Sequence, residues 1–211
     1  MSRIETESLN TGWEKLAHSE TIRQTVEGLS SRGFKAELVQ DRKEALERVR
    51  ELIPPGARVM TGGTTQEQIG LMDLLASGNH PWVNMKAEVL SEKNPDKQME
   101  LRRMGTFAQY FVGSVHAVAK TGELIAGSAS GSQLAAYAYG AENLILVVGA
   151  QKITQSLEDG LRRLREHSVP LEDRRMKSIG YPGTVLSKIL IMEKQTRPAV
   201  QVIIVNERLG F

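Results

Sequence analysis

A chain of 211 residues is long enough to bury one substantial core, and 40% hydrophobic with 25% charged residues is typical of a globular protein. A formal net charge of +2 and an aromatic content of 5% argue against a nucleic-acid partner or an anionic membrane surface. The chain has no cysteine, which excludes disulfides, thiolate nucleophiles and cysteine-held iron–sulfur clusters.

The four histidines have no metal-ligand spacing, so we expect no metal and no cofactor. The first residues, MSRIETESLNTGWEK, are polar and lack an apolar stretch, so we expect no signal peptide. No apolar run reaches membrane-spanning length. These features together predict a soluble protein of the cytoplasm.

The first third of the chain alternates between strand and helix patterns. Ile22, Val26 and Leu29 recur at helical spacing and predict a helix that ends before Gly33. The segments that follow are a strand at 35–40, a helix from Asp41 to Ile53, a strand at 57–63 and a helix at 64–77. This β-α-β-α order predicts a parallel sheet with crossover helices.

The remaining patterns add further strands, two of which are antiparallel. They are, in chain order, a strand near Trp82, a helix carrying Met99, Leu101 and Met104, a hairpin at 110–128, a helix from Ser132, a buried strand at 143–150, a helix from Ile153 to Leu164, and two strands at 184–192 and 199–207 that are close enough to pair. We therefore expect one domain with an open, mostly parallel α/β sheet, flanked by helices, and an antiparallel addition. Residues 1–35 form its N-terminal helical segment and residues 36–211 its core.

Two turns rich in small residues are the candidate binding loops. Gly62, Gly63, Thr64 and Thr65 follow a predicted buried strand, where glycines let backbone N–H groups approach a ligand and threonines add hydroxyls. The alternative is a capped helix start, because Thr64 and Thr65 are each followed three residues later by Glu67 or Gln68.

The second loop lies within AGSASGSQ, at 126–133. Its candidate ligand-binding residues are Ser128, Ser130, Gly131, Ser132 and Gln133. Ser130 and Gln133 also match a capping box, but that leaves the small Ser128 and Ser132 unexplained. We predict that the two loops face each other across one pocket at the carboxyl ends of the sheet and bind a small anionic metabolite.

The stretch GSVHAVAKTGELIAGSASGSQLAAYAYGAENLILVVGAQKI resembles the lactate-utilisation (LUD) domain family, which includes LutC-like proteins. The GGTT turn at 62–65, the PLEDRR segment at 170–175 and the closing VNERLGF agree with it, so the resemblance extends from about residue 36 onward. It implies a fold like that of ribose-5-phosphate isomerase, glucosamine-6-phosphate deaminase and the CoA transferases. It also implies a role in lactate or organic-acid oxidation, with partner subunits holding the redox cofactors.

Three departures from the family pattern bear on the site. Many relatives have arginine in place of Gln133 and an acid in place of Lys120, and some have a cysteine cluster near residues 176–194 that this chain lacks. The resemblance leaves the catalytic residues unknown.

Three functions remain open on the sequence. The first is a LutC-like binding protein or subunit of an oxidation system. The second is a stand-alone enzyme of the isomerase or CoA-transferase type, which would need Glu67, Glu123 or His116 close to both loops. The third is an interaction module, including a homo-oligomer, with an apolar patch instead of a polar pocket.

Overall fold

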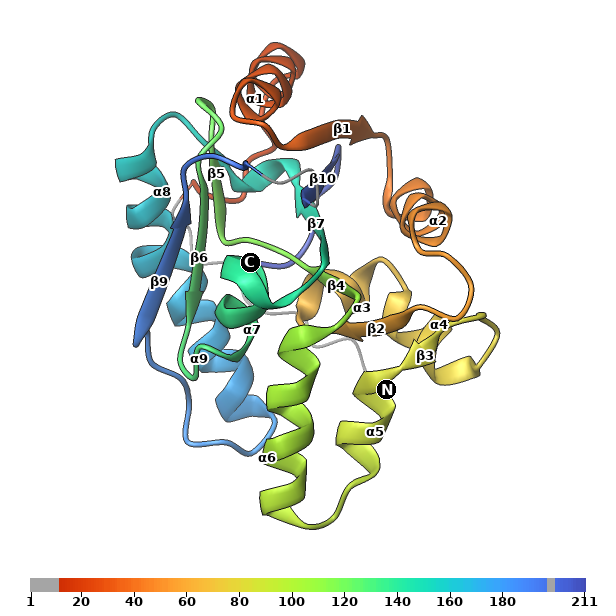
Figure 1. Cartoon of the computed structure of the whole chain (residues 1–211). Coiled ribbons are helices and arrows are strands. Elements are labelled where there is room, and N and C mark those ends of the chain that lie inside the picture. The colour runs from red at the N-terminus through yellow and green to blue at the C-terminus, as the bar shows by residue number, and fades with distance from the viewer. Residues whose placement is uncertain (1–11, 197–199) are drawn as a thin grey trace.

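The computed structural model describes residues 12–196 and 200–211, so the expectations for the first eleven residues lie outside it. Its main sheet has six strands: β1 (Lys35–Val39), β2 (Arg58–Thr61), β3 (Val83–Asn84), β4 (Tyr110–Gly113), β7 (Asn143–Gly149) and β10 (Val200–Val205). Their order across the sheet is β1-β10-β7-β4-β2-β3, and every neighbouring pair is parallel (Figure 1). The predicted parallel α/β sheet is confirmed.

The predicted antiparallel addition is a second sheet. Its strands are β5 (Ala117–Ala119), β6 (Leu124–Ser128), β8 (Ile153–Thr154) and β9 (Lys188–Met192), in the order β8-β5-β6-β9. β6 pairs antiparallel with β5 and β9, while β8 is parallel to β5. The predicted hairpin is therefore β5–β6 alone, because β4, at its expected start, belongs to the main sheet.

The two late strands do not pair with each other. β9 lies at the edge of the second sheet, whereas β10 lies inside the main sheet between β1 and β7. Burial explains the difference: β10 is a nearly continuous apolar run that suits a strand covered on both faces, while β9 is only half-buried.

Most predicted helices form, but the helix expected at 64–77 is divided. Gly70 adopts φ +83°, a left-handed conformation that ends one helix and begins the next. The α-helices are α1 (Ser19–Ser31), α2 (Arg42–Leu52), α3 (Thr64–Gln68), α4 (Leu71–Ser77), α5 (Met85–Ser91), α6 (Pro95–Met104), α7 (Ser132–Ala135), α8 (Leu157–Arg163) and α9 (Val169–Ser178). Two 3₁₀ turns (Gly105–Phe107, Ala150–Lys152) and two π-helical turns (Ala136–Gly140, Leu164–Ser168) complete the helical structure.

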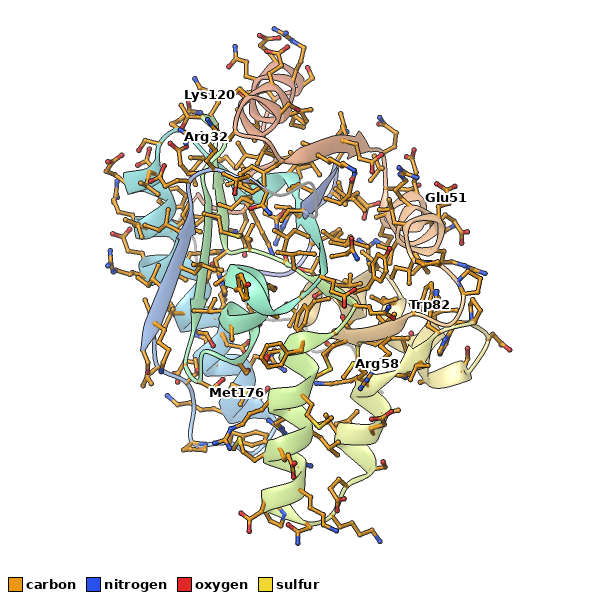
Figure 2. All side chains as sticks on the ribbon, in the orientation of Figure 1. Arg32, Glu51, Arg58, Trp82, Lys120 and Met176 are labelled. Carbon is orange, nitrogen blue, oxygen red and sulfur yellow. The ribbon has the colours of Figure 1, made fainter. Side chains whose placement is uncertain are left out.

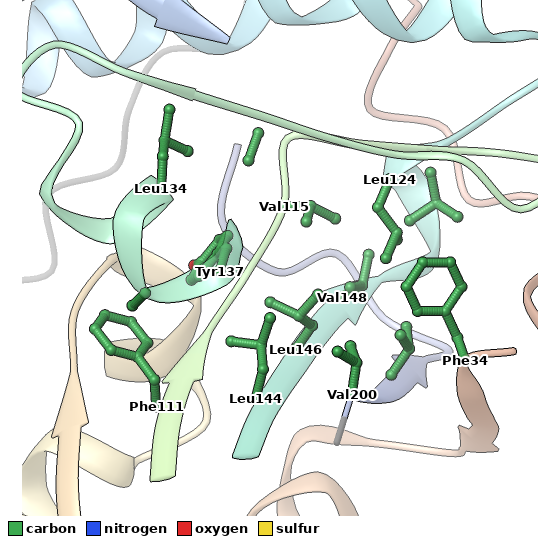
Figure 3. Packing of buried hydrophobic residues seen from close by; sticks show 14 of the residues in the cluster. Phe34, Phe111, Val115, Leu124, Leu134, Tyr137, Leu144, Leu146, Val148 and Val200 are labelled. Carbon is green, nitrogen blue, oxygen red and sulfur yellow. The ribbon is translucent and has the colours of Figure 1, made fainter. Parts of the chain in front are cut away.

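The core is divided by the main sheet into two faces. Leu144, Leu146 and Val148 of β7 pack toward the second sheet, in a cluster with Phe111, Val115, Leu124 and Tyr137 (Figure 3). Ile145 and Val147 point the other way, toward α2 and α4. This alternation explains why the strand reads as an unbroken apolar run.

Helix α1 packs closely against the β5–β6 turn at two glycines, Gly28 and Gly122. A Cβ atom on Gly28 would lie 2.7 Å from the Lys120 carbonyl oxygen, and one on Gly122 would lie 2.5 Å from the Gly28 carbonyl. Just beyond this contact Arg32 donates to the Thr121 carbonyl at 2.6 Å and pairs with the carboxylate of Glu123. Figure 2 shows Arg32 beside Lys120 at this end of the molecule. Glu123 is thus engaged in holding α1.

Candidate functional site

A pocket of about 310 Å³ lies where the two sheets meet. Its lining includes Gly62, Gly63, Thr64 and Thr65 from the first loop and Ser128, Ser130, Ser132 and Gln133 from the second. The two loops therefore face a common space, as their composition predicts. Gly131 is not in the lining; its N–H donates to Ser128 Oγ at 2.9 Å and so shapes the second loop.

The predicted position at one sheet edge is only half correct. The first loop follows β2 of the main sheet, but the second follows β6 of the second sheet. The pocket is consequently built between layers: loops that follow strands of both sheets line it, together with residues of α9 and of the segment 184–186. Nothing in the sequence indicates two sheets, because the β5–β6 strands are as apolar as the central ones.

The first loop does not form a capping box. The residue before α3 is Gly63, at φ +114°, and no side chain caps the helix. Thr64 is already inside the helix, and the Thr65 hydroxyl contacts Lys152 instead. The capping interpretation of these two threonines is therefore wrong: the Thr64 side chain lines the pocket, and the Thr65 hydroxyl accepts a hydrogen bond from Lys152.

The second loop also lacks the predicted capping box. Gly131, at φ +88°, precedes α7, and no side chain caps that helix. The Gln133 amide donates to the Gly127 carbonyl at 3.3 Å, and Ser130 and Ser132 hydrogen-bond to each other at 3.1 Å. Hydrogen bonds among these small polar residues thus stabilise the loop, and the same residues line the pocket.

Backbone strain at Gly63 gives a first prediction. Gly63→Ala should lower the free energy of unfolding by roughly 1–3 kcal/mol, because L residues rarely adopt its φ and the new Cβ would lie 3.0 Å from Gln66 Oε1. Gly62→Ala is the matched control: that glycine has no left-handed φ, and its Cβ would meet only Lys86 Nζ, at 3.9 Å. Chemical denaturation of both variants checks this, and equal stabilities would contradict it.

The pocket contains a buried lysine that the sequence patterns did not single out. Lys152 is 3% exposed, and its Nζ donates to Thr65 Oγ1 at 3.2 Å and to Ser114 Oγ at 3.1 Å. No carboxylate of the described residues forms an ion pair with it. Burial, and secondly the positive charge of Arg163, hold the pKa of Lys152 well below its ordinary value.

A buried guanidinium lies behind the pocket wall. Arg163 is fully buried, and its Nη1 donates to the His116 carbonyl and, at 3.1 Å, to Ser168 Oγ, both in residues that line the pocket. Its Nε and Nη2 have no hydrogen-bond partner among the described residues. Burial lowers the pKa of Arg163 to about 10, so the guanidinium is charged at neutral pH.

His116 lines the pocket as a neutral ring. Burial, followed by the charges of Lys152 and Arg163, lowers the pKa of His116 to about 3. Its Nδ1 accepts from the Gly127 N–H at 3.1 Å, so the ring hydrogen is assigned to Nε2. Of the three groups that an acid–base enzyme could use, His116 lines the pocket, while Glu67 and Glu123 do not.

The lining has little negative charge of its own. Glu172 is the one acidic residue among the described lining residues, and Arg175 neutralises it with two hydrogen bonds of 2.7 Å. The amide of Gln66, also in the lining, is buried without a partner for either polar atom among the described residues. A buried amide in this state retains its full capacity to bond a ligand.

The sequence contains a feature from which Lys152 could have been predicted as a site residue. Lys152 comes three residues after Gly149, the last residue of the central strand β7, and the carboxyl ends of parallel strands are where ligands gather. It also falls within the VVGAQKI motif. Gln66, Ser114 and Arg163 had no comparable signal, because their proximity depends on how the two sheets pack.

Two further findings concern metal and membrane. Within residues 12–196 and 200–211, no three histidine, aspartate or glutamate side chains are grouped so that they could hold a metal ion. None of the helices in these ranges is long and apolar enough to cross a bilayer.

The geometry defines a two-sheet α/β protein with a polar pocket between its layers. Comparison with known proteins gives the family: the LUD domain matches residues 22–202, and the chain belongs to that family. The fold is similar to the crystal structure of a DUF162 family protein from Deinococcus radiodurans, with a TM-score of 0.57 at 13% identity, over 91% of this chain and 100% of that one. No curated protein matches the chain.

Proposed function

We propose that the pocket binds a small organic acid, of the size and class of lactate and related metabolites, in a LutC-like role in organic-acid utilisation in the cytoplasm. The observation that carries this proposal is the charge balance of the site. Arg163 places a fully buried positive charge behind the wall, with its Nε and Nη2 lacking a hydrogen-bond partner among the described residues, and the carboxylate of Glu172 is already neutralised by Arg175. An anion entering the pocket therefore meets attraction without a competing carboxylate.

The polar lining suits the rest of such a molecule. The Gln66 amide and the hydroxyls of Thr64, Ser128 and Ser132 can bond a hydroxyl or carbonyl oxygen next to the carboxylate. The volume of about 310 Å³ is at the small end of the range of ligand pockets. A stand-alone enzyme using Glu67 or Glu123 is not favoured, because neither carboxylate reaches the pocket.

Ligand binding should be visible as thermal stabilisation. A ligand at about 100 times its Kd stabilises the folded state by about 2.7 kcal/mol. The screen uses lactate, pyruvate, larger hydroxy acids, sugar phosphates, CoA esters and nucleotides, and we expect carboxylic acids to raise the melting temperature. Ser132→Leu should weaken the effect, because leucine would narrow the pocket at a lining position.

The control is the same change elsewhere on the surface. Ser91, at the end of α5, is exposed and is not in the lining, so Ser91→Leu should respond to acids as the wild type does. If no acid stabilises the wild type, or if both variants respond alike, the pocket is not an organic-acid site.

A further inference from the structure

The hydrogen bonds around Lys152 point to a second property of the site. Its Nζ donates to two hydroxyl oxygens, Thr65 Oγ1 and Ser114 Oγ. A neutral amine has two hydrogens and one lone pair, so these two bonds use both hydrogens and leave the lone pair free. An ammonium would have a third hydrogen, and the described residues offer it no acceptor.

We propose that Lys152 is a nucleophile that forms an imine with the carbonyl group of a 2-oxo acid bound in this pocket. The inference rests on the proposed organic-acid site and names the ligand class more closely. It uses the same charge arrangement: Arg163 attracts the carboxylate, and Lys152 attacks the adjacent carbonyl carbon.

The surroundings favour the nucleophilic form. A lysine that is desolvated and lies near another cationic group is activated as an amine, because both effects penalise the ammonium. Lys152 meets both conditions through its burial and through Arg163. An ordinary lysine is neutral in only about one molecule in a thousand or fewer at pH 7.

The step is balanced without an oxidant or a reductant. The Nζ lone pair forms a bond to the carbonyl carbon, and the carbonyl oxygen takes up a proton to give a carbinolamine. Loss of water then breaks the carbon–oxygen bond and leaves a carbon–nitrogen double bond. The hydroxyls of Thr65 and Ser114 contact the nitrogen and can carry its two protons to the carbonyl oxygen, which leaves with both of them as water.

Borohydride trapping tests the proposal on the whole chain. The protein is incubated at pH 7 with pyruvate and then reduced, and intact mass and peptide mapping locate the adduct. We expect one adduct per chain, on Lys152, formed at least about tenfold faster than on any other lysine, since Lys152 alone among the described lysines is buried in the pocket lining. Lys152→Met should abolish it while circular dichroism shows the same fold.

Two controls assign the roles of the neighbours and of the carboxylate. Thr65→Val removes one of the two hydroxyls and should slow trapping, whereas Ser91→Leu should leave it unchanged. Acetone, which has the carbonyl but no carboxylate, should label at least about tenfold more slowly, the equivalent of about 1.4 kcal/mol in barrier.

The outcomes separate this inference from the proposed function. Stabilisation by pyruvate without any trapped adduct would overturn the imine and leave the organic-acid site standing. Adducts spread over several lysines, or equal labelling by acetone, would also overturn the imine proposal. If no acid stabilises the protein and no adduct forms, the organic-acid site fails together with the imine.

Discussion

Gly122→Ala should lower the free energy of unfolding by about 3 kcal/mol or more. Two effects combine at this position. Gly122 adopts φ +99°, and a Cβ would lie 2.5 Å from the Gly28 carbonyl carbon and 2.7 Å from the Leu29 nitrogen, both backbone atoms of α1. Since neither backbone can yield without moving the helix, α1 and the β5–β6 turn would separate.

Gly56→Ala separates the conformational strain from the steric crowding. Gly56 has φ +79°, but a Cβ added there would meet nothing within 4 Å, so its replacement costs only conformational strain of about 1 kcal/mol. Urea denaturation of the two variants gives the difference, which measures the crowding at the glycine contact. Equal losses would show that α1 adapts, and would contradict tight packing between α1 and the turn.

Lys152→Met should stabilise the protein at neutral pH, and the gain should shrink as the pH rises. Because the folded-state pKa of Lys152 is lowered, the unfolded chain holds one more proton between that pKa and about 10.4, and wild-type stability rises with pH across this window. Methionine removes this dependence. The advantage of the variant should fall by up to about 2.7 kcal/mol between pH 7 and pH 9.

The measurement is chemical denaturation of both proteins at the two pH values without added acids. Lys35→Met is the matched control, because Lys35 is exposed on β1 and its replacement should change stability equally at both. A constant difference between Lys152→Met and the wild type would show that the buried amine takes up no proton on unfolding.

Much of the main sheet could be predicted because each of its strands has a recognisable local sequence pattern. Residues 143–149 read as an apolar run and form the central strand, and the glycine turn after Thr61 lies at the predicted strand end. That β9 and β10 belong to different sheets could not be predicted, since both are short apolar segments that differ only in how deeply the folded protein buries them.

The candidate site was likewise predictable only in part. Small residues in two loops predicted a shared pocket, because glycine and serine leave space whatever the packing around them. The polar groups that give this space its chemistry come from distant positions: Thr65 meets Lys152 across 87 residues, and Ser114 meets it across 38. Such long-range contacts depend on how the two sheets pack against each other, and no local sequence pattern indicates that packing.

The π-helical turns have a consequence for how the chain length can vary. Tyr137, Leu164 and Ser168 line the pocket and lie in the two π turns, Ala136–Gly140 and Leu164–Ser168. A π turn holds one residue more than an α-helical turn needs, so deleting a residue there restores α-helical geometry while the flanking helix keeps its direction. Removing a single residue of this chain at either place would therefore bring a different side chain to the pocket wall.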